Sequence, residues 1–176
     1  MESGQAGVEV AGKSTPAVVE RVDNQLVVTA GPLRATLGGI GDGGATAALD
    51  KDGNVRLSPG DDIRIVLAGF EPGSEVEAWL FSTPVLLGTA TVGADGKVSG
   101  TFTVPENSPE GAHRIAIVAR TTEGEPATLT VGVVVGEWKG SPRVALWLIV
   151  TPLVIAMVGA LVLPATRRRR RSALTD

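Results

Sequence analysis

The chain has 176 residues, enough for one domain with short appendages, and it is rich in turn-forming residues, with 23 Gly and 11 Pro. This composition favours short strands joined by turns over helices, whose interiors Gly and Pro weaken. The absence of Cys excludes a disulfide framework, a thiolate metal site and a cysteine nucleophile.

The formal charge of −3 conceals two regions of opposite sign. Residues 1–142 carry 10 Lys and Arg against 18 Asp and Glu, whereas residues 143–176 carry six Arg and one Asp. Nucleic-acid binding needs clustered Lys and Arg to neutralise phosphates, so the acidic body is not expected to bind nucleic acid.

Residues 1–21 contain Gly, Ala and Ser and are expected to form a flexible N-terminal linker. They include neither the basic region nor the apolar region of a signal peptide. For an exported body, the simplest explanation is that this chain is the C-terminal part of a longer exported protein, or that the gene start was misassigned.

Gly7–Ser14 matches the phosphate-binding pattern GxxxxGK[ST] letter for letter. That loop binds phosphate when a buried strand leads into it and a helix follows. Too few residues precede Gly7 for such a strand, and Pro16 follows Ser14 closely. We interpret the match as chance and expect no nucleotide or other cofactor.

Apolar and polar residues alternate with a period of two over residues 22–136, which predicts an all-β domain with one buried face per sheet. The clearest strands are expected at residues 62–67, 75–80, 98–104, 114–119 and 128–135. Less regular strands are expected at residues 25–30, 33–37 and 45–49. Closely spaced strands without helical patterns indicate an immunoglobulin-like β-sandwich.

Turn residues separate these strands. Asp52-Gly53 and Asp95-Gly96 are hairpin signals, and Pro59-Gly60 and Pro72-Gly73 mark sharp turns.

Asp50, Asp52 and Asn54 alternate as in short calcium loops, but a full loop needs a Glu at its end, where this chain has Asp61. A turn explains the first three residues without metal, and calcium stays as the alternative.

Trp79 and Phe81 share one face of their predicted strand with Glu75 and Glu77. We expect the aromatic side chains to be buried under the strands of residues 22–50, as a central-strand Trp is in many sandwiches. In the alternative, they stand exposed beside the carboxylates and form a partner-binding face.

His113 is the sole histidine, which excludes a His-pair metal site. It lies on the same alternating face as Ile115, so it is expected to pack at a corner where a strand starts. No other catalytic motif is present, and we expect no enzymatic activity.

Between Leu57 and Ile117 the chain contains, in order, the segments PGD, GFEPGS, WLFSTPVLLGT, a DG hairpin, TVP and a GAH corner. This third of the chain resembles an immunoglobulin-like module repeated in actinobacterial surface proteins. The resemblance implies an extracytoplasmic β-sandwich near the end of a large exported protein, and it implies no defined ligand.

After a spacer over residues 137–143, the twenty residues of Val144–Leu163 contain no charge. As a helix they would extend about 30 Å, the thickness of a bilayer's hydrocarbon core. Trp147 suits the headgroup level, and Pro152 is expected to kink the helix. The sequence therefore predicts one transmembrane helix that anchors the domain in a lipid bilayer.

The basic tail, residues 164–176, contains five consecutive arginines directly after this helix: Arg167, Arg168, Arg169, Arg170 and Arg171. The positive-inside rule places them in the cytoplasm and residues 1–142 outside a plasma membrane crossed once. The alternative is a tail-anchored protein whose domain stays in the cytoplasm.

These expectations combine into a non-enzymatic stalk module of a cell-surface protein, with other surface proteins or cell-wall components as candidate partners. The alternative is an adhesion or ligand-binding module that uses the aromatic face of Trp79 and Phe81.

Overall fold

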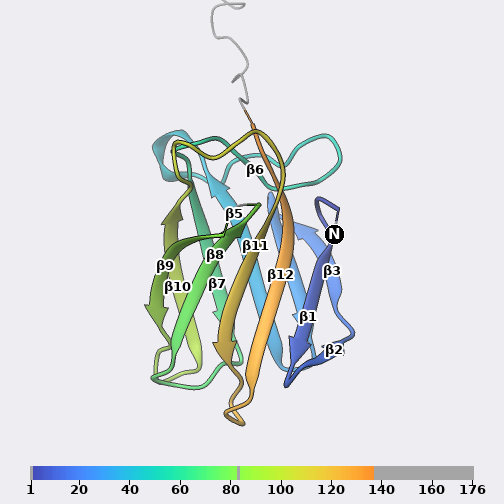
Figure 1. Ribbon diagram of the computed structural model, residues 1–176, viewed down its shortest axis with the longest axis vertical. Helices are drawn as coiled ribbons and strands as arrows, with labels where there is room; N and C mark the ends of the chain where they lie inside the picture. Colours follow the sequence, from blue (N-terminus) through green and yellow to red (C-terminus); the bar gives the residue numbers. More distant parts are fainter. Residues whose placement is uncertain (1, 83, 137–176) are drawn as a thin grey trace, which may run out of the picture. The chain divides into compact units, whose positions relative to one another are not determined.

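The computed structural model describes residues 2–82 and 84–136, which form two packed β-sheets (Figure 1). The seven-stranded sheet contains, in spatial order, β2 (Lys13–Thr15), β1 (Ala6–Val10), β12 (Pro126–Val135), β11 (Gly111–Arg120), β8 (Glu75–Phe81) and β9 (Val85–Thr91), with β6 (Arg56–Leu57) beside the end of β12. The five-stranded sheet contains β10 (Lys97–Thr103), β7 (Asp62–Ala68), β5 (Leu33–Ile40), β4 (Gln25–Ala30) and β3 (Val18–Val22).

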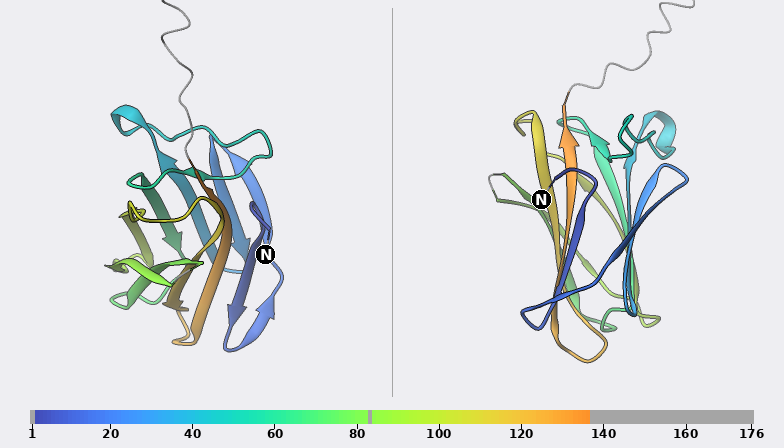
Figure 2. Two further views of the ribbon diagram at one scale, coloured as in Figure 1. Left: turned by 45° about the horizontal axis from the view of Figure 1, so that its top comes forward. Right: turned by 90° about the vertical axis from the view of Figure 1, so that its right-hand side faces the viewer.

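Neighbouring strands pair antiparallel, except that the short β6 runs parallel to β12. A single 3₁₀ turn, η1 (Asp42–Gly44), follows β5 in the described part of the chain. The right-hand view of Figure 2 shows the two sheets edge-on as two layers. The prediction of an all-β sandwich is therefore confirmed.

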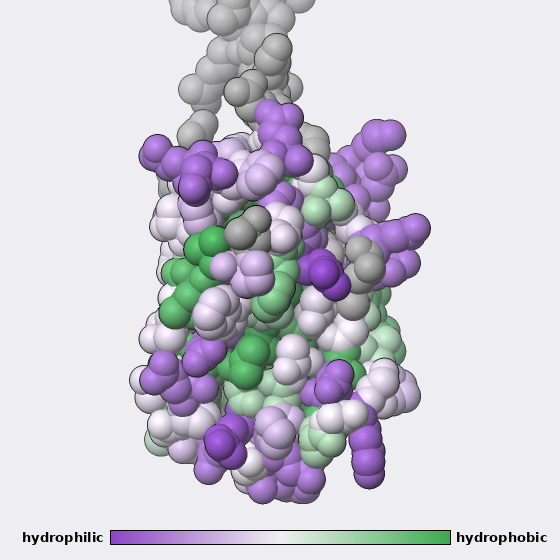
Figure 3. Space-filling view, viewed as in Figure 1, coloured by the Kyte–Doolittle hydropathy of each residue, from purple (hydrophilic) through white to green (hydrophobic). Residues whose placement is uncertain are grey.

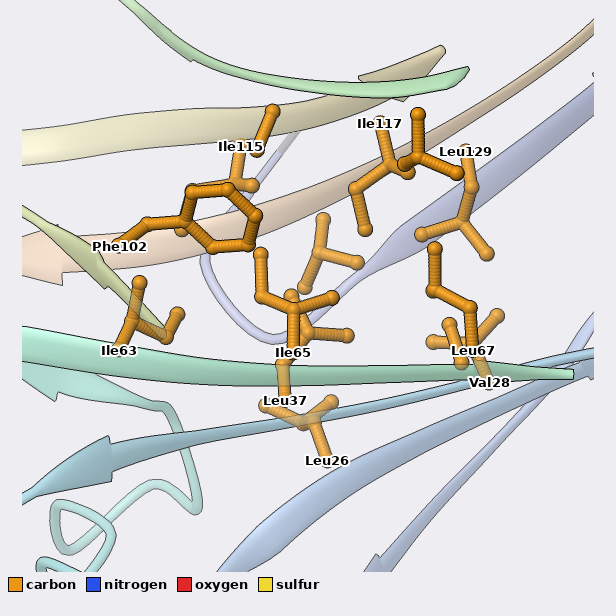
Figure 4. Packing of buried hydrophobic residues seen from close by; sticks show 14 of the residues in the cluster. Leu26, Val28, Leu37, Ile63, Ile65, Leu67, Phe102, Ile115, Ile117 and Leu129 are labelled. Atoms are coloured by element: carbon orange, nitrogen blue, oxygen red, sulfur yellow. The ribbon is translucent and has the colours of Figure 1, made fainter. Parts of the chain in front are cut away.

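The core lies between the two sheets and is filled by the inward residues of each strand. Ile115, Ile117 and Leu129 come from the seven-stranded sheet, and they face Ile65 and Leu67 of β7 (Figure 4). All five side chains are buried, which confirms the predicted period-two alternation of β7, β11 and β12.

Phe102 closes one edge of the sandwich, where β10 of one sheet meets β9 of the other. Its ring packs against Gly88 and Gly100, which have no side chains to exclude it. A Cβ at Gly100 would lie 2.6 Å from the ring atom Cε2. The turn at Asp95-Gly96 connects these edge strands, with a hydrogen bond from the N–H of Gly93 to the carbonyl of Lys97 at 2.7 Å.

The N-terminal residues differ from the expected linker over residues 1–21. Residues 6–22 contain β1, β2 and β3, and β1 pairs with β12 from Ala6 opposite Val131 to Val10 opposite Ala127. The structured domain therefore begins well before residue 22. These strands are short, and Val18 and Val22 of the edge strand β3 are exposed, so they lack the strong alternation of the central strands.

Two further expectations about local structure are wrong. Residues 45–49 form no strand and contribute one isolated bridge, between Ile40 and Thr46. Asp52-Gly53 closes a loop instead of joining two strands, because the N–H of Gly53 bonds to the carbonyl of Asp50. In addition, β9 was not predicted, since its outer-edge residues are largely exposed.

The predicted spacer, transmembrane helix and basic tail, over residues 137–143, 144–163 and 164–176, lie outside the described residues, as do Trp147, Pro152 and Arg167–Arg171. Within residues 2–82 and 84–136, no helix has the length and apolarity needed to span a bilayer.

Candidate functional site

Strand β8 directs two sets of side chains to opposite faces of the seven-stranded sheet. Val76, Ala78 and Leu80 point inward and are buried. Trp79 and Phe81 point outward and are half-buried, so the expectation that they belong to the core is wrong. The strands expected to cover them, β4 and β5, belong to the other sheet, where β5 pairs with β7, and they lie across the core.

The indole of Trp79 is held along its strand by a neighbour on the same face. Its Nε1–H donates a hydrogen bond to Oε2 of Glu77 at 2.8 Å. Because these residues are two apart in one strand, the ring must lean along β8 instead of standing away from it. The indole is partly exposed in this position.

Trp79 is the second member of a row that crosses five strands. Its direct cross-strand neighbours are Leu86 of β9 and Ala116 of β11. Ala116 lies opposite Thr130 of β12, which lies opposite Gly7 of β1. We call these five residues the cross-strand row. Ala116, next to the indole, carries only a methyl group, and Gly7 at the end of the row carries no side chain.

One end of the row is apolar. Leu86 is 45% exposed, Val85 is 38% exposed and Val118 is 37% exposed. Figure 3 shows hydrophobic side chains gathered over β9 and β11 on this face, among hydrophilic ones. Leu86, opposite Trp79, and Val118, opposite Glu77, share the outer face with Trp79 and Phe81, whereas Val85 lies opposite the inward-facing Leu80. Single exposed apolar residues are ordinary, but Leu86 and Val118 beside two aromatic side chains are typical of an interaction surface.

The other end of the row is polar and hollowed. A surface depression of about 190 Å³ is lined by Gly7, Val8, Glu9, Ser14, Thr128 and Thr130. Thr128 and Thr130 share the outward face of β12 with the row, and Glu9 lies opposite Thr128 in β1. The strand of Thr128 and Thr130 was predicted, but the hollow was missed because β1 and β2, which supply its other residues, had been interpreted as linker.

The phosphate-loop match forms part of this same region, as a β-hairpin. Gly7 lies in β1, and β2 follows a two-residue turn of Ala11 and Gly12, whose φ values are 50° and 76°. Val10 and Lys13 close the hairpin as a pair. No helix follows Ser14, so this segment lacks the geometry that holds phosphates.

His113 is buried at the start of β11, as expected for a packed corner. Its Nε2 lies 2.7 Å from the carbonyl of Pro109, and its Nδ1 lies 3.0 Å from Oγ of Ser82. A carbonyl only accepts, so Nε2 carries the proton, and in the neutral ring Nδ1 accepts from the Ser82 hydroxyl. This contact joins the WLFSTP segment to the GAH corner, beside a pocket of about 160 Å³ that Leu80 and Asn107 also line.

Asp50 organises the loop that was considered for calcium. Its Oδ1 accepts from the N–H groups of Asp52 and Asn54, each at 2.8 Å, and its Oδ2 accepts from the Asn54 amide at 2.9 Å. Asp61 instead accepts from the N–H of Ser58 in a separate turn. The geometry is that of a self-contained turn, and among the described residues no three acidic, His or Cys side chains are grouped for a metal.

Partial burial acts to raise the pKa of the Asp50 carboxyl, but its hydrogen bonds outweigh that effect. The donors are the backbone and side chain of Asn54 and the backbone of Asp52, with Arg56 adding a favourable charge. The net result is a pKa below the ordinary value of 3.8.

No protein-family model matches the chain, and no curated protein sequence is similar to it. Among solved structures, a chitin binding domain from Burkholderia pseudomallei is 14% identical with a TM-score of 0.33, over 46% of this chain and 56% of that domain. The chain thus spans little more than half the length of that structure. The PmoD soluble domain from Methylocystis sp. ATCC 49242 (Rockwell) is 10% identical with a TM-score of 0.41, over 62% of this chain and 97% of that domain. Neither similarity bears on function.

Proposed function

We propose that the chain is a non-enzymatic cell-surface module that binds a partner through the outer face of its seven-stranded sheet. In this proposal an immunoglobulin-like β-sandwich lies outside a bacterial plasma membrane, and a helix over residues 144–163 holds it there. The apolar length of that segment and the five arginines after it support the anchor and its orientation.

One observation carries the binding role: Trp79 lies outside the core, half-buried on an open sheet face. Large aromatic side chains dominate binding energies when a partner covers them. The hydrogen bond to Glu77 orders the indole before any partner arrives, which lowers the entropy lost on binding. Leu86 and Val118 extend the same surface on the two neighbouring strands.

A stalk that spaces a larger exported assembly from the membrane is the second proposal. It is supported by β12, the last strand before residue 137, which is paired on both sides, with β11 and with β1. The chain would therefore continue towards the anchor from a strand inside the sheet and not from an edge strand.

The positions of the domain's two ends favour partner binding over transmission of force. The N–H of Gly4 bonds to the carbonyl of Gly132 at 2.9 Å, so the chain enters close to the end from which β12 leaves (Figure 1). Tension between residues 2 and 136 would open the β1–β12 ladder one pair at a time, starting at Gly132. Such a ladder opens at a lower force than a ladder whose hydrogen bonds must all break at the same time.

Photo-crosslinking in intact cells tests the proposed function. A benzophenone amino acid replaces Leu86 in the full chain, and a matched variant carries it at Val66, which is 37% exposed on the outer face of the other sheet. We expect a crosslinked species from position 86 only, and we expect Trp79→Ala to remove it while the fold is kept. Equal crosslinking from both positions, or none from position 86, would contradict the binding role.

A further inference from the structure

We propose that the occupant of this face is a neutral glycan chain, lying across the strands along the cross-strand row. One sugar ring stacks on Trp79, and hydroxyl groups further along the chain bind in the hollow beside Thr130. This inference rests on the proposed binding function and names the class of ligand for the same site.

The indole provides a stacking surface of the right kind. It lies on the outward side of β8, partly exposed, and its hydrogen bond to Glu77 fixes its direction. An aromatic face carries partial negative charge, so it attracts the weakly positive C–H groups that cover one side of a sugar ring. The direct neighbour of the indole in β11, Ala116, is small and 6% exposed, so it does not obstruct a ligand that continues from Trp79 along the row.

The hollow provides the hydrogen bonds that a sugar needs. Thr128, Thr130 and Ser14 carry hydroxyls that both donate and accept, and Glu9 accepts. Sugar hydroxyls likewise donate and accept, so both sides are satisfied. An apolar peptide or lipid chain lying here would leave these groups desolvated and unpaired, which costs binding free energy.

The length of the row requires an extended ligand. Trp79 in β8 and Thr130 in β12 are two strands apart, about 10 Å, and Gly7 in β1 is one strand further, at about 14 Å. A single sugar cannot contact both the indole and the hollow, whereas a short oligosaccharide can.

The charges beside the row favour an uncharged ligand. Glu77 and Glu9 lie next to it on one side, and Arg114 lies on the other, opposite Phe81. A polyanion would be repelled by the two carboxylates, and a polycation would meet Arg114. The balance of charges selects a neutral chain.

Tryptophan fluorescence of the full chain tests this assignment. The chain has three Trp, so Trp138→Phe and Trp147→Phe leave Trp79 as the single indole. The protein is held in a detergent without a sugar headgroup, because a sugar detergent would compete. It is titrated with neutral tetrasaccharides of glucose, N-acetylglucosamine, mannose, galactose and arabinose, and with a tetrameric polyuronate.

We expect at least one neutral tetrasaccharide to change the emission saturably and the polyuronate to bind more weakly. By calorimetry, Trp79→Ala should weaken binding at least tenfold and Thr130→Ala about three- to tenfold, as for a lost hydrogen bond. Val66→Ser on the other sheet is the matched control and should change nothing. Far-UV circular dichroism of each variant checks that its fold is kept.

The titration and the crosslinking experiment together distinguish a failure of the glycan assignment from a failure of the binding role. If no neutral tetrasaccharide binds, if the polyuronate binds best, or if Trp79→Ala binds normally, the glycan assignment is overturned. A protein trapped by the crosslinker at position 86, with no glycan binding, leaves the binding role in place and refutes the glycan. Failure of both experiments refutes both proposals.

Discussion

His113 and Ser82, 31 residues apart in sequence, are joined by a hydrogen bond of 3.0 Å between Nδ1 and Oγ. The same ring donates from Nε2 to the carbonyl of Pro109 at 2.7 Å. The imidazole thus connects the β8–β9 turn to the corner before β11. The ring is 4% exposed, whereas Ser82 lies at the surface.

His113→Ala is expected to destabilise the domain by about 2–4 kcal/mol, because it removes a buried ring and leaves the hydroxyl and carbonyl without this partner. Ser82→Ala removes one hydrogen bond at an exposed residue and should cost about 1 kcal/mol or less. Urea unfolding followed by circular dichroism measures both. Ser99→Ala, on the exposed face of β10, is the control and should stay within about 0.5 kcal/mol of the unchanged protein. Equal losses for His113→Ala and Ser99→Ala would contradict this account.

Asp50 is expected to make the domain sensitive to acid. A carboxyl whose pKa is lowered in the folded state stabilises the fold above its unfolded pKa, and this contribution is lost as the pH falls through the lower folded value. The loss should therefore occur below about pH 4. Asp50→Asn sets an amide against the Asn54 amide, so it should reduce stability at pH 7 and flatten the change below pH 4. Urea unfolding between pH 2 and pH 7 measures both effects, and an unchanged acid slope would refute the role of Asp50.

The central strands were predictable from sequence because burial on one face imposes strict alternation. Ile63, Ile65 and Leu67 of β7 are an example, since each is buried and each is followed by a more exposed residue. Edge strands face weaker constraints, because one side of their backbone has no partner and more of their side chains stay in solvent. This is why β3, with Val18 and Val22 exposed, was missed.

The candidate site was only partly predictable for a different reason. Alternation in β8 separates Trp79 and Phe81 from Val76 and Leu80, but both sets contain large apolar residues, so it does not say which set faces inward. That choice depends on which strands pair across the chain. The polar end of the row depends on the pairing of Gly7 with Thr130, whose distance in sequence gives no local signal.

Gly132→Ala is expected to release the N-terminal segment from the sheet. A Cβ at this position would overlap the backbone carbonyl of Glu2, which lies over β12. Gly132 also exchanges backbone hydrogen bonds with Gly4 and Gln5, each at 2.9 Å. Hydrogen exchange should therefore accelerate at Gly4 while Ile117, in the core, keeps its protection. Gly124→Ala tests specificity, because a Cβ there meets nothing within 4 Å, although its φ of 80° adds local strain.

The five arginines are expected to fix the orientation of the anchor. With Arg167–Arg171 retained in the cytosol, a fluorescent protein fused after Asp176 should fold and fluoresce, and alkaline phosphatase at the same point should be inactive. Replacing all five arginines with Ala removes the charge bias, because only Lys139 and Arg143 then flank the apolar segment, both on its N-terminal side. A fraction of the molecules should then invert, seen as a gain of phosphatase activity in intact cells. An active phosphatase on the unmodified sequence would place the tail outside the cell. Residues 1–142 would then face the cytoplasm, which would contradict a glycan-binding site at the cell surface.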